Sequence, residues 1–268
     1  MREELLPPLS PRGRGEKVDL IGMHSGRPGG PRPSEASFLF RPSSFREWLK
    51  ALVWDFGYCV TFSTFTLAFS YRFEGGRNVP ATGPALIVSN HQSFLDPMLV
   101  GLATSNRRVA FLARRTLFRG AFAGLIRLLN AVPVEQVGMA KEGLRAVLEL
   151  LDAGWPVVMF PEGERTRTGK MQPLRPGIHL LLKRTTAPVI PVGIAGAVDA
   201  LPYRRSWPHF TPFLSGVTRP GGIAVSVGRP LDSARLGALP REQALAELAA
   251  AIAACQQRAE SLRRQPRG

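Results

Sequence analysis

Residues 85–102 read ALIVSNHQSFLDPMLVGL, a stretch that opens as a buried strand and closes as a helix. His91 and Asp96 are five positions apart, so on one continuous helix their side chains would point about 140° away from each other. Pro97 suits the first turn of a helix and keeps its predecessor out of helical conformation, which makes Asp96 the expected N-cap. We therefore expect the pair to meet across a turn, with His91 on the strand-to-helix loop.

A histidine held by a carboxylate in this way can act as a general base, because the carboxylate fixes the tautomer and stabilises the imidazolium. No Ser or Cys with the context of a nucleophile accompanies the pair, which favours direct attack by an acceptor alcohol over a covalent acyl-enzyme. The alternative is structural, with Asp96 as a cap and His91 as a hydrogen-bonded loop residue.

Short apolar runs alternate with helical patterns from residue 84 onward, which predicts an α/β fold with a largely parallel central sheet flanked by helices. The expected strands are 84–89, 109–113, 131–135, 155–160, 188–196 and 222–228. The expected helices are 97–105, 116–129, 139–153, 176–185 and 240–264. In such sheets the chemistry lies in loops beyond the carboxyl ends of the strands.

The composition fits one folded domain with an anionic partner. The chain has 268 residues, of which 44% are hydrophobic, and its formal net charge is +15. This balance argues against a cationic ligand and for a phosphate on a lipid, a nucleotide or a nucleic acid. A basic nucleic-acid-binding protein is therefore an alternative, although no recognisable binding module is present and we expect no nucleic-acid partner.

The cysteines and histidines do not predict a metal site. Cys59 and Cys255 lie far apart in sequence in apolar settings, which excludes a disulfide-dense scaffold and a CxxC site. The four histidines never fall at HExxH or HxH spacing. We expect no catalytic metal and no bound cofactor.

The amino-terminal part divides into a polar tail and an apolar segment. Residues 1–43 mix Pro, Gly, Arg and Ser without apolar periodicity and are expected to be disordered. Residues 44–75 are rich in aromatic side chains, but the uninterrupted apolar part after Asp55 has 16 residues, about 24 Å of helix against about 30 Å of hydrocarbon. A membrane-contacting interfacial helix, or a shallow helical hairpin with a bend near Gly57, fits better than a span. A buried core helix is the alternative.

A second window, residues 155–182, places charged residues after another buried strand. The strand ends at Phe160, and the loop after it carries Glu162, Glu164, Arg165, Arg167, Lys170 and Arg175. Guanidinium groups at the carboxyl end of a sheet can bind a phosphate monoester through paired hydrogen bonds. The alternative is that these charged residues belong to an ordinary solvated loop. A third basic stretch, residues 107–120, suits phosphate or a bilayer.

These windows resemble the glycerolipid acyltransferase family, whose members acylate lysophosphatidic acid and related lysophospholipids. The resemblance runs from about Phe73 to Gly228 and rests on four blocks in order. They are the lead-in GRNVPATGPALIVSNH, the NHxxxxD signature at 90–96, FPEG-x-R at 160–165, and PVIPVGIAG at 188–196.

The resemblance implies an O-acyltransferase of phospholipid biosynthesis and a role for each matching residue. His91 would deprotonate the hydroxyl of a lysolipid acceptor, Asp96 would orient His91, and the hydroxyl would attack a thioester of coenzyme A or acyl carrier protein. The residues implied to bind the acceptor are Arg114, Glu162, Gly163, Arg165 and Arg167.

Two departures from the family pattern bear on the acceptor. The second block ends in Glu135-Gln136 where relatives carry an acidic residue followed by Arg, and Glu164 replaces the usual Thr. The first change removes a cation and the second adds a carboxylate near the acceptor, which disfavours a phosphate dianion. A zwitterionic lysophospholipid or a lyso-ornithine lipid is therefore an open alternative acceptor, and a non-catalytic lipid-binding relative is another alternative.

The expected organisation of the chain has four segments. We divide it into a tail (1–43), a membrane-associating helical segment (44–75), an acyltransferase domain (76–235), and a carboxyl-terminal helix with a basic tail (236–268). The resemblance implies a protein on the cytoplasmic face of the inner membrane, with the lipid surface as a partner.

Overall fold

The computed structural model describes residues 45–105, 107–115, 118, 131–134, 139–201 and 222–265. Several expectations lie outside these residues. They are the tail 1–43, nearly all of the helix 116–129, Glu135 and Gln136 of the second block, and the basic end 266–268.

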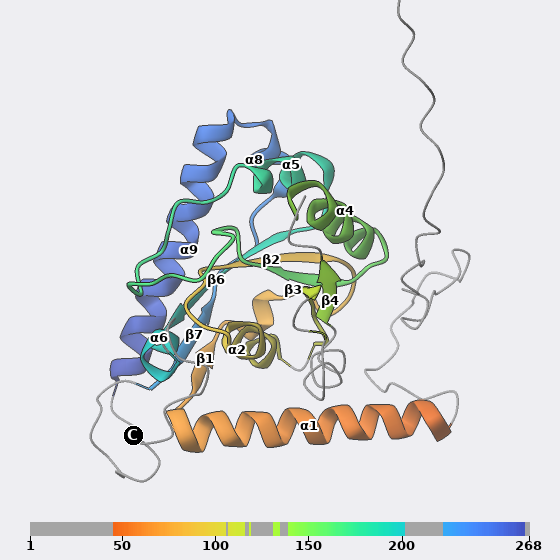
Figure 1. Cartoon of the computed structure of the whole chain (residues 1–268), viewed down its shortest axis with the longest axis vertical. Helices are drawn as coiled ribbons and strands as arrows, with labels where there is room; N and C mark the ends of the chain where they lie inside the picture. The colour runs from red at the N-terminus through yellow and green to blue at the C-terminus, as the bar shows by residue number, and fades with distance from the viewer. Residues whose placement is uncertain are drawn as a thin grey trace, which may run out of the picture. The chain divides into compact units, whose positions relative to one another are not determined.

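The described residues form a sheet in the order β1-β7-β6-β2-β5-β3-β4 (Figure 1). Its strands are β1 (Arg72–Glu74), β2 (Ala85–Ser89), β3 (Ala110–Arg114), β4 (Ala131–Val134), β5 (Pro156–Met159), β6 (Val189–Ala195) and β7 (Ala224–Val227). The five strands from β6 to β4 are mutually parallel, whereas β7 is antiparallel to β6 and β1 is parallel to β7. The six predicted strands and the largely parallel sheet are confirmed, and β1 was not predicted.

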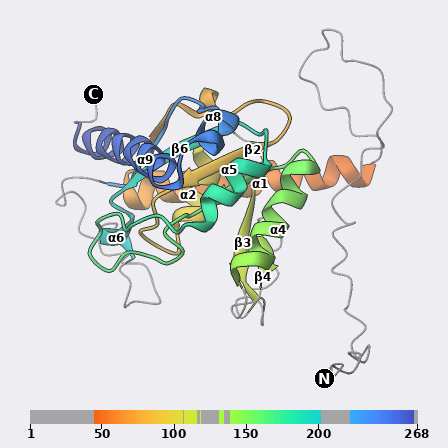
Figure 2. The same cartoon turned by 90° about the horizontal axis from the view of Figure 1, so that it is seen from above.

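Helices flank the sheet, as expected. They are α1 (Phe45–Phe69), α2 (Asp96–Ala103), α4 (Met139–Asp152), α5 (Gly177–Arg184), α6 (Ala197–Ala200), α8 (Ser233–Ala238) and α9 (Arg241–Arg264), with a 3-10 turn η2 (Gly76–Asn78). Figure 2 shows α4 alongside β3 and β4. The helices predicted over 97–105, 139–153, 176–185 and 240–264 correspond to α2, α4, α5 and α9.

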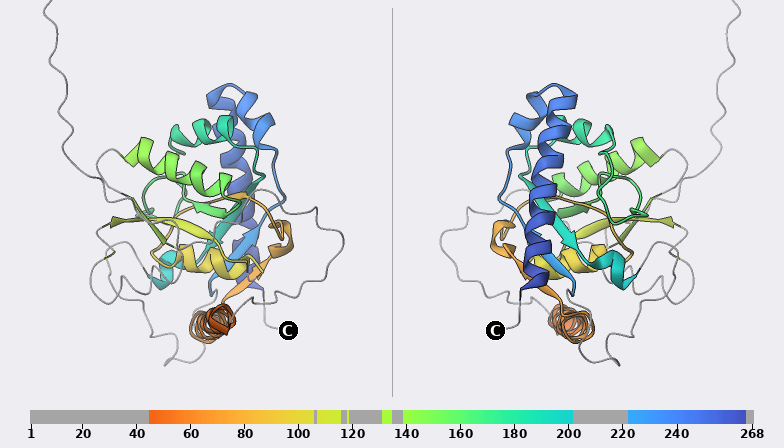
Figure 3. Two further views of the ribbon diagram at one scale, coloured as in Figure 1. Left: turned by 90° about the vertical axis from the view of Figure 1, so that its right-hand side faces the viewer. Right: turned by 90° about the vertical axis from the view of Figure 1, so that its left-hand side faces the viewer.

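The middle of the sheet is buried on both faces. Every residue of β2 and β6 is buried, which explains why both strands are continuous apolar runs rather than alternating ones. On one face, Ile87 shares a buried cluster with Phe65 of α1 and Leu99 of α2. On the other face, α9 lies directly on β6 at Gly193, where an added Cβ would fall 2.0 Å from the backbone nitrogen of Gln256. Figure 3 shows α9 running along the sheet and α1 seen end-on.

Helix α1 is a single helix that runs through Gly57, so the hairpin alternative is wrong. Nothing lies within 4 Å of a Cβ added at Gly57, and one glycine inside a helix costs only about 1 kcal/mol, which does not break it. No helix of the described ranges combines the length and the hydropathy needed to cross a bilayer.

The two faces of α1 differ in their surroundings. The inward face carries Phe65 and Phe69 into the core, and the Tyr58 hydroxyl donates to the carbonyl oxygen of Leu102 in α2 at 3.0 Å. The outward face exposes four large apolar side chains, those of Leu52, Phe56, Val60 and Leu67, together with the polar residues Asp55, Ser63 and Thr64. The expectation of a buried core helix therefore holds for one face only.

The close contact between Gly193 of β6 and the backbone of α9 gives a prediction about stability. Gly193→Ala should lower the free energy of unfolding by about 1–3 kcal/mol, because the new methyl group has no room against the α9 backbone. Urea denaturation measures the loss. Gly57→Ala is the matched control and should stabilise the protein slightly, since its methyl group meets nothing. Equal free energies of unfolding for Gly193→Ala and the wild type would contradict this packing.

Candidate active site

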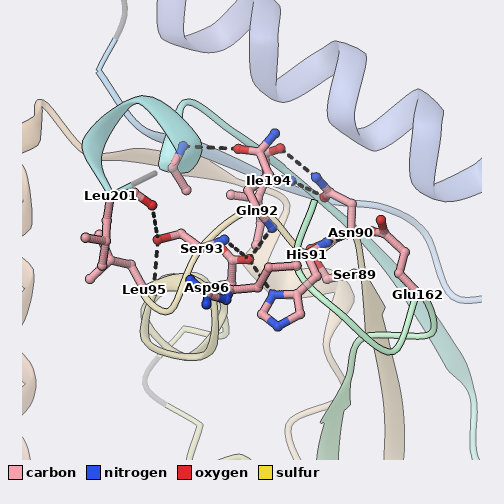
Figure 4. Close-up of polar contacts among 12 residues, drawn as sticks. Ser89, Asn90, His91, Gln92, Ser93, Leu95, Asp96, Glu162, Ile194 and Leu201 are labelled. Carbon is pink, nitrogen blue, oxygen red and sulfur yellow. Dashed lines mark hydrogen bonds and ion pairs between the residues drawn. The ribbon is translucent and has the colours of Figure 1, made fainter. Parts of the chain in front are cut away.

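His91 and Asp96 meet at the turn between β2 and α2, as the sequence predicts (Figure 4). The Nδ1 atom of His91 lies 2.8 Å from Oδ2 of Asp96. The His91 side chain is 18% exposed, whereas Asp96 is fully buried. A solvent-accessible imidazole backed by a buried carboxylate is an arrangement suited to moving a proton.

The Asp96 carboxylate holds the loop rather than capping the helix. Its Oδ2 atom accepts hydrogen bonds from the backbone N–H groups of Gln92 at 2.5 Å and Ser93 at 2.8 Å. The expectation that Asp96 is the N-cap is wrong: Asp96 is the first helical residue, and Leu95 precedes the helix without a side-chain cap. The carboxylate turns back to the loop, where its charge also lies close to the positive end of α2.

Two side-chain amides fix the loop to the neighbouring strand β6, to the start of α6 and to the loop after β5. Asn90 accepts the Ile194 N–H at 2.7 Å and donates to the Ile194 carbonyl at 3.0 Å, as a strand residue would. Gln92 accepts the Ala197 N–H at 3.1 Å and donates to the Gly169 carbonyl at 3.4 Å. Neither amide was predicted to have a role, although their position directly around His91 was the available signal.

The loop after β5 contacts His91 because β5 pairs with β2 in parallel, which brings their carboxyl ends together. The Phe160 ring stacks on the imidazole with 4.2 Å between ring centroids. Oε1 of Glu162 accepts the backbone N–H of His91 at 2.7 Å, and Oε2 accepts that of Gln172 at 2.6 Å. The backbone N–H of Thr166 donates to the His91 carbonyl at 2.8 Å. One loop therefore holds both the ring and the backbone of His91.

Burial raises the pKa of Glu162 from its ordinary value, and hydrogen bonds from the backbone of Gln172 and His91 oppose the rise. The side chain is only 1% exposed. Glu162 therefore lies at the site, but its carboxylate binds the backbone N–H groups of His91 and Gln172 rather than facing solvent.

The other predicted acceptor residues differ in their placement. Arg165 stacks over Phe94, with its guanidinium carbon 3.4 Å from the ring centroid. Arg167 lies on the same loop and is exposed. Gly163 has a φ of +79°, a conformation that favours glycine, and Arg175 packs beside it. Arg114 ends β3 at the same edge of the sheet, but its side chain lies outside the described part of the chain.

Within the described ranges, no three His, Cys, Asp or Glu side chains are grouped in a way that could hold a metal ion. His91, held by Asp96, is placed to perform general acid–base transfer. The basic residues nearby add affinity for an anion.

Known proteins resemble this chain in sequence and in fold. An acyltransferase family model matches residues 70–195, which include His91, Asp96 and Glu162. The chain is 25% identical over 178 residues to a chloroplastic 1-acyl-sn-glycerol-3-phosphate acyltransferase of Arabidopsis thaliana, covering 65% of this chain and 47% of that one. It is 23% identical over 176 residues to the 1-acyl-sn-glycerol-3-phosphate acyltransferase of Bacillus subtilis, covering 65% and 80%. The chain spans about half the length of the plant relatives that it matches.

A solved structure has the same fold. The 1-acyl-sn-glycerophosphate acyltransferase PlsC of Thermotoga maritima superposes with a TM-score of 0.64 and 25% sequence identity, covering 83% of this chain and 85% of that one. Together, the family model, these relatives and this structure support a glycerolipid acyltransferase family for the chain.

Proposed function

We propose that the protein is a membrane-associated O-acyltransferase that transfers a fatty acyl group from a thioester to the hydroxyl of lysophosphatidic acid, in glycerolipid biosynthesis. The observation that carries the proposal is a partly exposed imidazole whose Nδ1 atom lies 2.8 Å from a buried carboxylate. The relatives supply the substrate class, because their names describe acyltransferases of 1-acyl-sn-glycerol-3-phosphate.

His91 is the general base of the proposed reaction. With its Nδ1–H donated to Asp96, the imidazole keeps a free lone pair on Nε2 for the acceptor hydroxyl. As that proton transfers to Nε2, the acceptor oxygen forms a bond to the thioester carbonyl carbon. The tetrahedral intermediate then expels the thiolate, which takes the proton from the imidazolium. Asp96 stabilises the imidazolium through charge, and Phe160 adds the attraction of its ring face.

Lysophosphatidic acid is the acceptor that the basic residues favour. The expectation of a different lysolipid rested partly on the added carboxylate of Glu164, but Oε1 of Glu164 lies 3.5 Å from Nη2 of Arg175, which reduces its repulsion of an anion. Arg165 and Arg167 lie on the loop that contacts His91, and Arg114 ends a strand at the same edge of the sheet. We assign these three arginines to the acceptor phosphate.

The thioester would come from coenzyme A or acyl carrier protein. Both are anionic partners, and a chain with a formal charge of +15 attracts either. Donor choice stays a prediction to be tested with both thioesters, as does the expected cytoplasmic face of the inner membrane.

The outward face of α1 supports association with a lipid surface. Leu52, Phe56 and Val60 recur every four residues, and Leu67 lies eleven residues after Phe56, so all four share one side of the helix. Their exposed fractions range from 47% to 73%. Burying such a stripe in the interfacial region of a bilayer removes apolar surface from water, which favours a helix lying on the membrane.

Acyl transfer tests the proposal directly. The purified protein should transfer labelled acyl groups to lysophosphatidic acid faster than to lyso-ornithine lipid or a zwitterionic lysophospholipid. His91→Ala should lower kcat by about 10²- to 10⁴-fold, because the proposed general base is removed. Full activity of His91→Ala would remove His91 from the mechanism. Salt-dependent DNA binding without acyl transfer would favour the nucleic-acid alternative.

Variants of Asp96 should distinguish the effect of its charge on catalysis from the effect of its hydrogen bonds on the stability of the loop. In Asp96→Asn, the amide oxygen can still accept from the loop N–H groups, so the protein should fold normally while kcat falls by about 10²-fold or more from loss of charge. Asp96→Ala leaves these N–H groups without their acceptor and should also lower the free energy of unfolding by about 1–3 kcal/mol. Urea denaturation of both variants and their kcat values make the comparison. Equal stability of the two variants would contradict the loop role.

Flotation with lipid vesicles tests the membrane face. Leu67→Asp should reduce the vesicle-bound fraction by about threefold or more, because it places a charge in the stripe that the proposal inserts into lipid. Leu180→Asp is the matched control, since Leu180 is an equally large side chain that is 50% exposed on α5. The proposed face is wrong if the two variants bind vesicles alike.

A further inference from the structure

We propose that Glu162 is a positioning residue that holds the backbone of His91, and that it does not contact the acceptor. This inference rests on the proposed function, because it concerns the same base. The family resemblance groups Glu162 with the acceptor-binding residues, whereas its hydrogen bonds direct the carboxylate elsewhere. Oε1 accepts the His91 N–H at 2.7 Å, and Oε2 accepts the Gln172 N–H at 2.6 Å.

The hydrogen bond from the His91 N–H to Glu162 is one of two that fix the His91 backbone, and we call these two bonds the clamp. On the other side of the same residue, the His91 carbonyl accepts the N–H of Thr166 at 2.8 Å. Both peptide groups that flank the His91 side chain are therefore bound to one loop. Asp96 and Phe160 fix the ring, and Glu162 and Thr166 fix the backbone from which the ring projects.

The geometry requires a carboxylate at this position. Two backbone N–H groups approach one side chain, and each needs an acceptor of its own. A glutamine offers a single acceptor oxygen, and its NH₂ group would face the second N–H donor. Glutamate satisfies both donors at the cost of burying its charge, and burial accordingly raises the pKa of Glu162.

Burial also argues against a contact with the acceptor. Glu162 is 1% exposed, whereas Arg165 is partly exposed beside Phe94. A carboxylate placed against a phosphate dianion would repel it, while a guanidinium group would attract it. The anionic headgroup is therefore assigned to the arginines, and Glu162 acts on the reaction through His91.

Kinetics distinguish positioning from acceptor binding. In Glu162→Ala and Glu162→Gln, kcat should fall by about tenfold to a hundredfold, because displacement of a catalytic group by about 1 Å has effects of this size. KM for lysophosphatidic acid should stay within about twofold of wild type, since no acceptor contact is lost. A raised KM with unchanged kcat would overturn the proposal, as would wild-type kcat in both variants.

Asp232 provides the matched control. Its Oδ1 atom also accepts two backbone N–H groups, those of Ala234 at 2.8 Å and Arg235 at 3.4 Å, at the start of α8. This turn lies next to Val189, at the amino end of β6 and so away from the carboxyl ends that carry the site. Asp232→Ala likewise removes a carboxylate that accepts two backbone N–H groups, although an exposed one, and should lower the melting temperature while leaving kcat and KM at wild-type values.

Hydrogen–deuterium exchange provides a readout that does not depend on activity. A peptide covering residues 86–95 contains the His91 amide, and its exchange should accelerate in Glu162→Ala and Glu162→Gln but not in Asp232→Ala. Unchanged exchange in the Glu162 variants would overturn the proposal even if activity fell. A wild-type protein without acyl transfer would instead overturn the proposed function, and the exchange experiment would still test the clamp.

Discussion

The site depends on one buried charge, the carboxylate of Asp96. Removing an ionised carboxylate from water is costly, and the cost is tolerable only where donors replace the water. Here the donors are two backbone N–H groups of the preceding loop and the imidazole of His91, with the amino-terminal end of α2 close by. Because two of these donors are backbone groups, the loop must keep one conformation for the charge to stay buried.

This requirement explains why so much of the surrounding structure is hydrogen-bonded to the loop. Asn90 and Gln92 attach it to β6 and to the start of α6, and Glu162 and Thr166 attach it to the loop after β5. The parallel arrangement makes both attachments possible, because β2 lies between β5 and β6 and all three strands end at one edge. Residues that are some 70 positions apart in sequence thereby become neighbours of the same histidine.

The sequence predicts the strands and longer helices well because each contains a sustained apolar pattern. It does not predict β1, α6 or α8, which have three, four and six residues and are too short to carry such a pattern. The meeting of His91 and Asp96 follows from local geometry, since Pro97 fixes where the helix begins. The N-cap assignment fails because the Asp96 carboxylate binds the loop N–H groups, a choice that depends on the folded loop. The contacts of Glu162 and Phe160 depend on strand order, which no local pattern encodes.

Hydrogen bonds from Tyr58 of α1 and from Tyr71, which follows α1, join this part of the chain to α2. The hydroxyl of Tyr58 binds the carbonyl of Leu102, and that of Tyr71 binds the carbonyl of Leu99 at 2.7 Å, so two hydroxyls hold the later turns of α2. The first residue of α2 is Asp96. If the outward face of α1 lies on lipid, as proposed, these hydrogen bonds link the lipid-facing helix to the helix that begins with Asp96. Under the proposed function, a lysolipid that stays partly in the membrane would then present its hydroxyl to His91 from one direction, which is the entropic advantage of holding two reactants in a defined geometry.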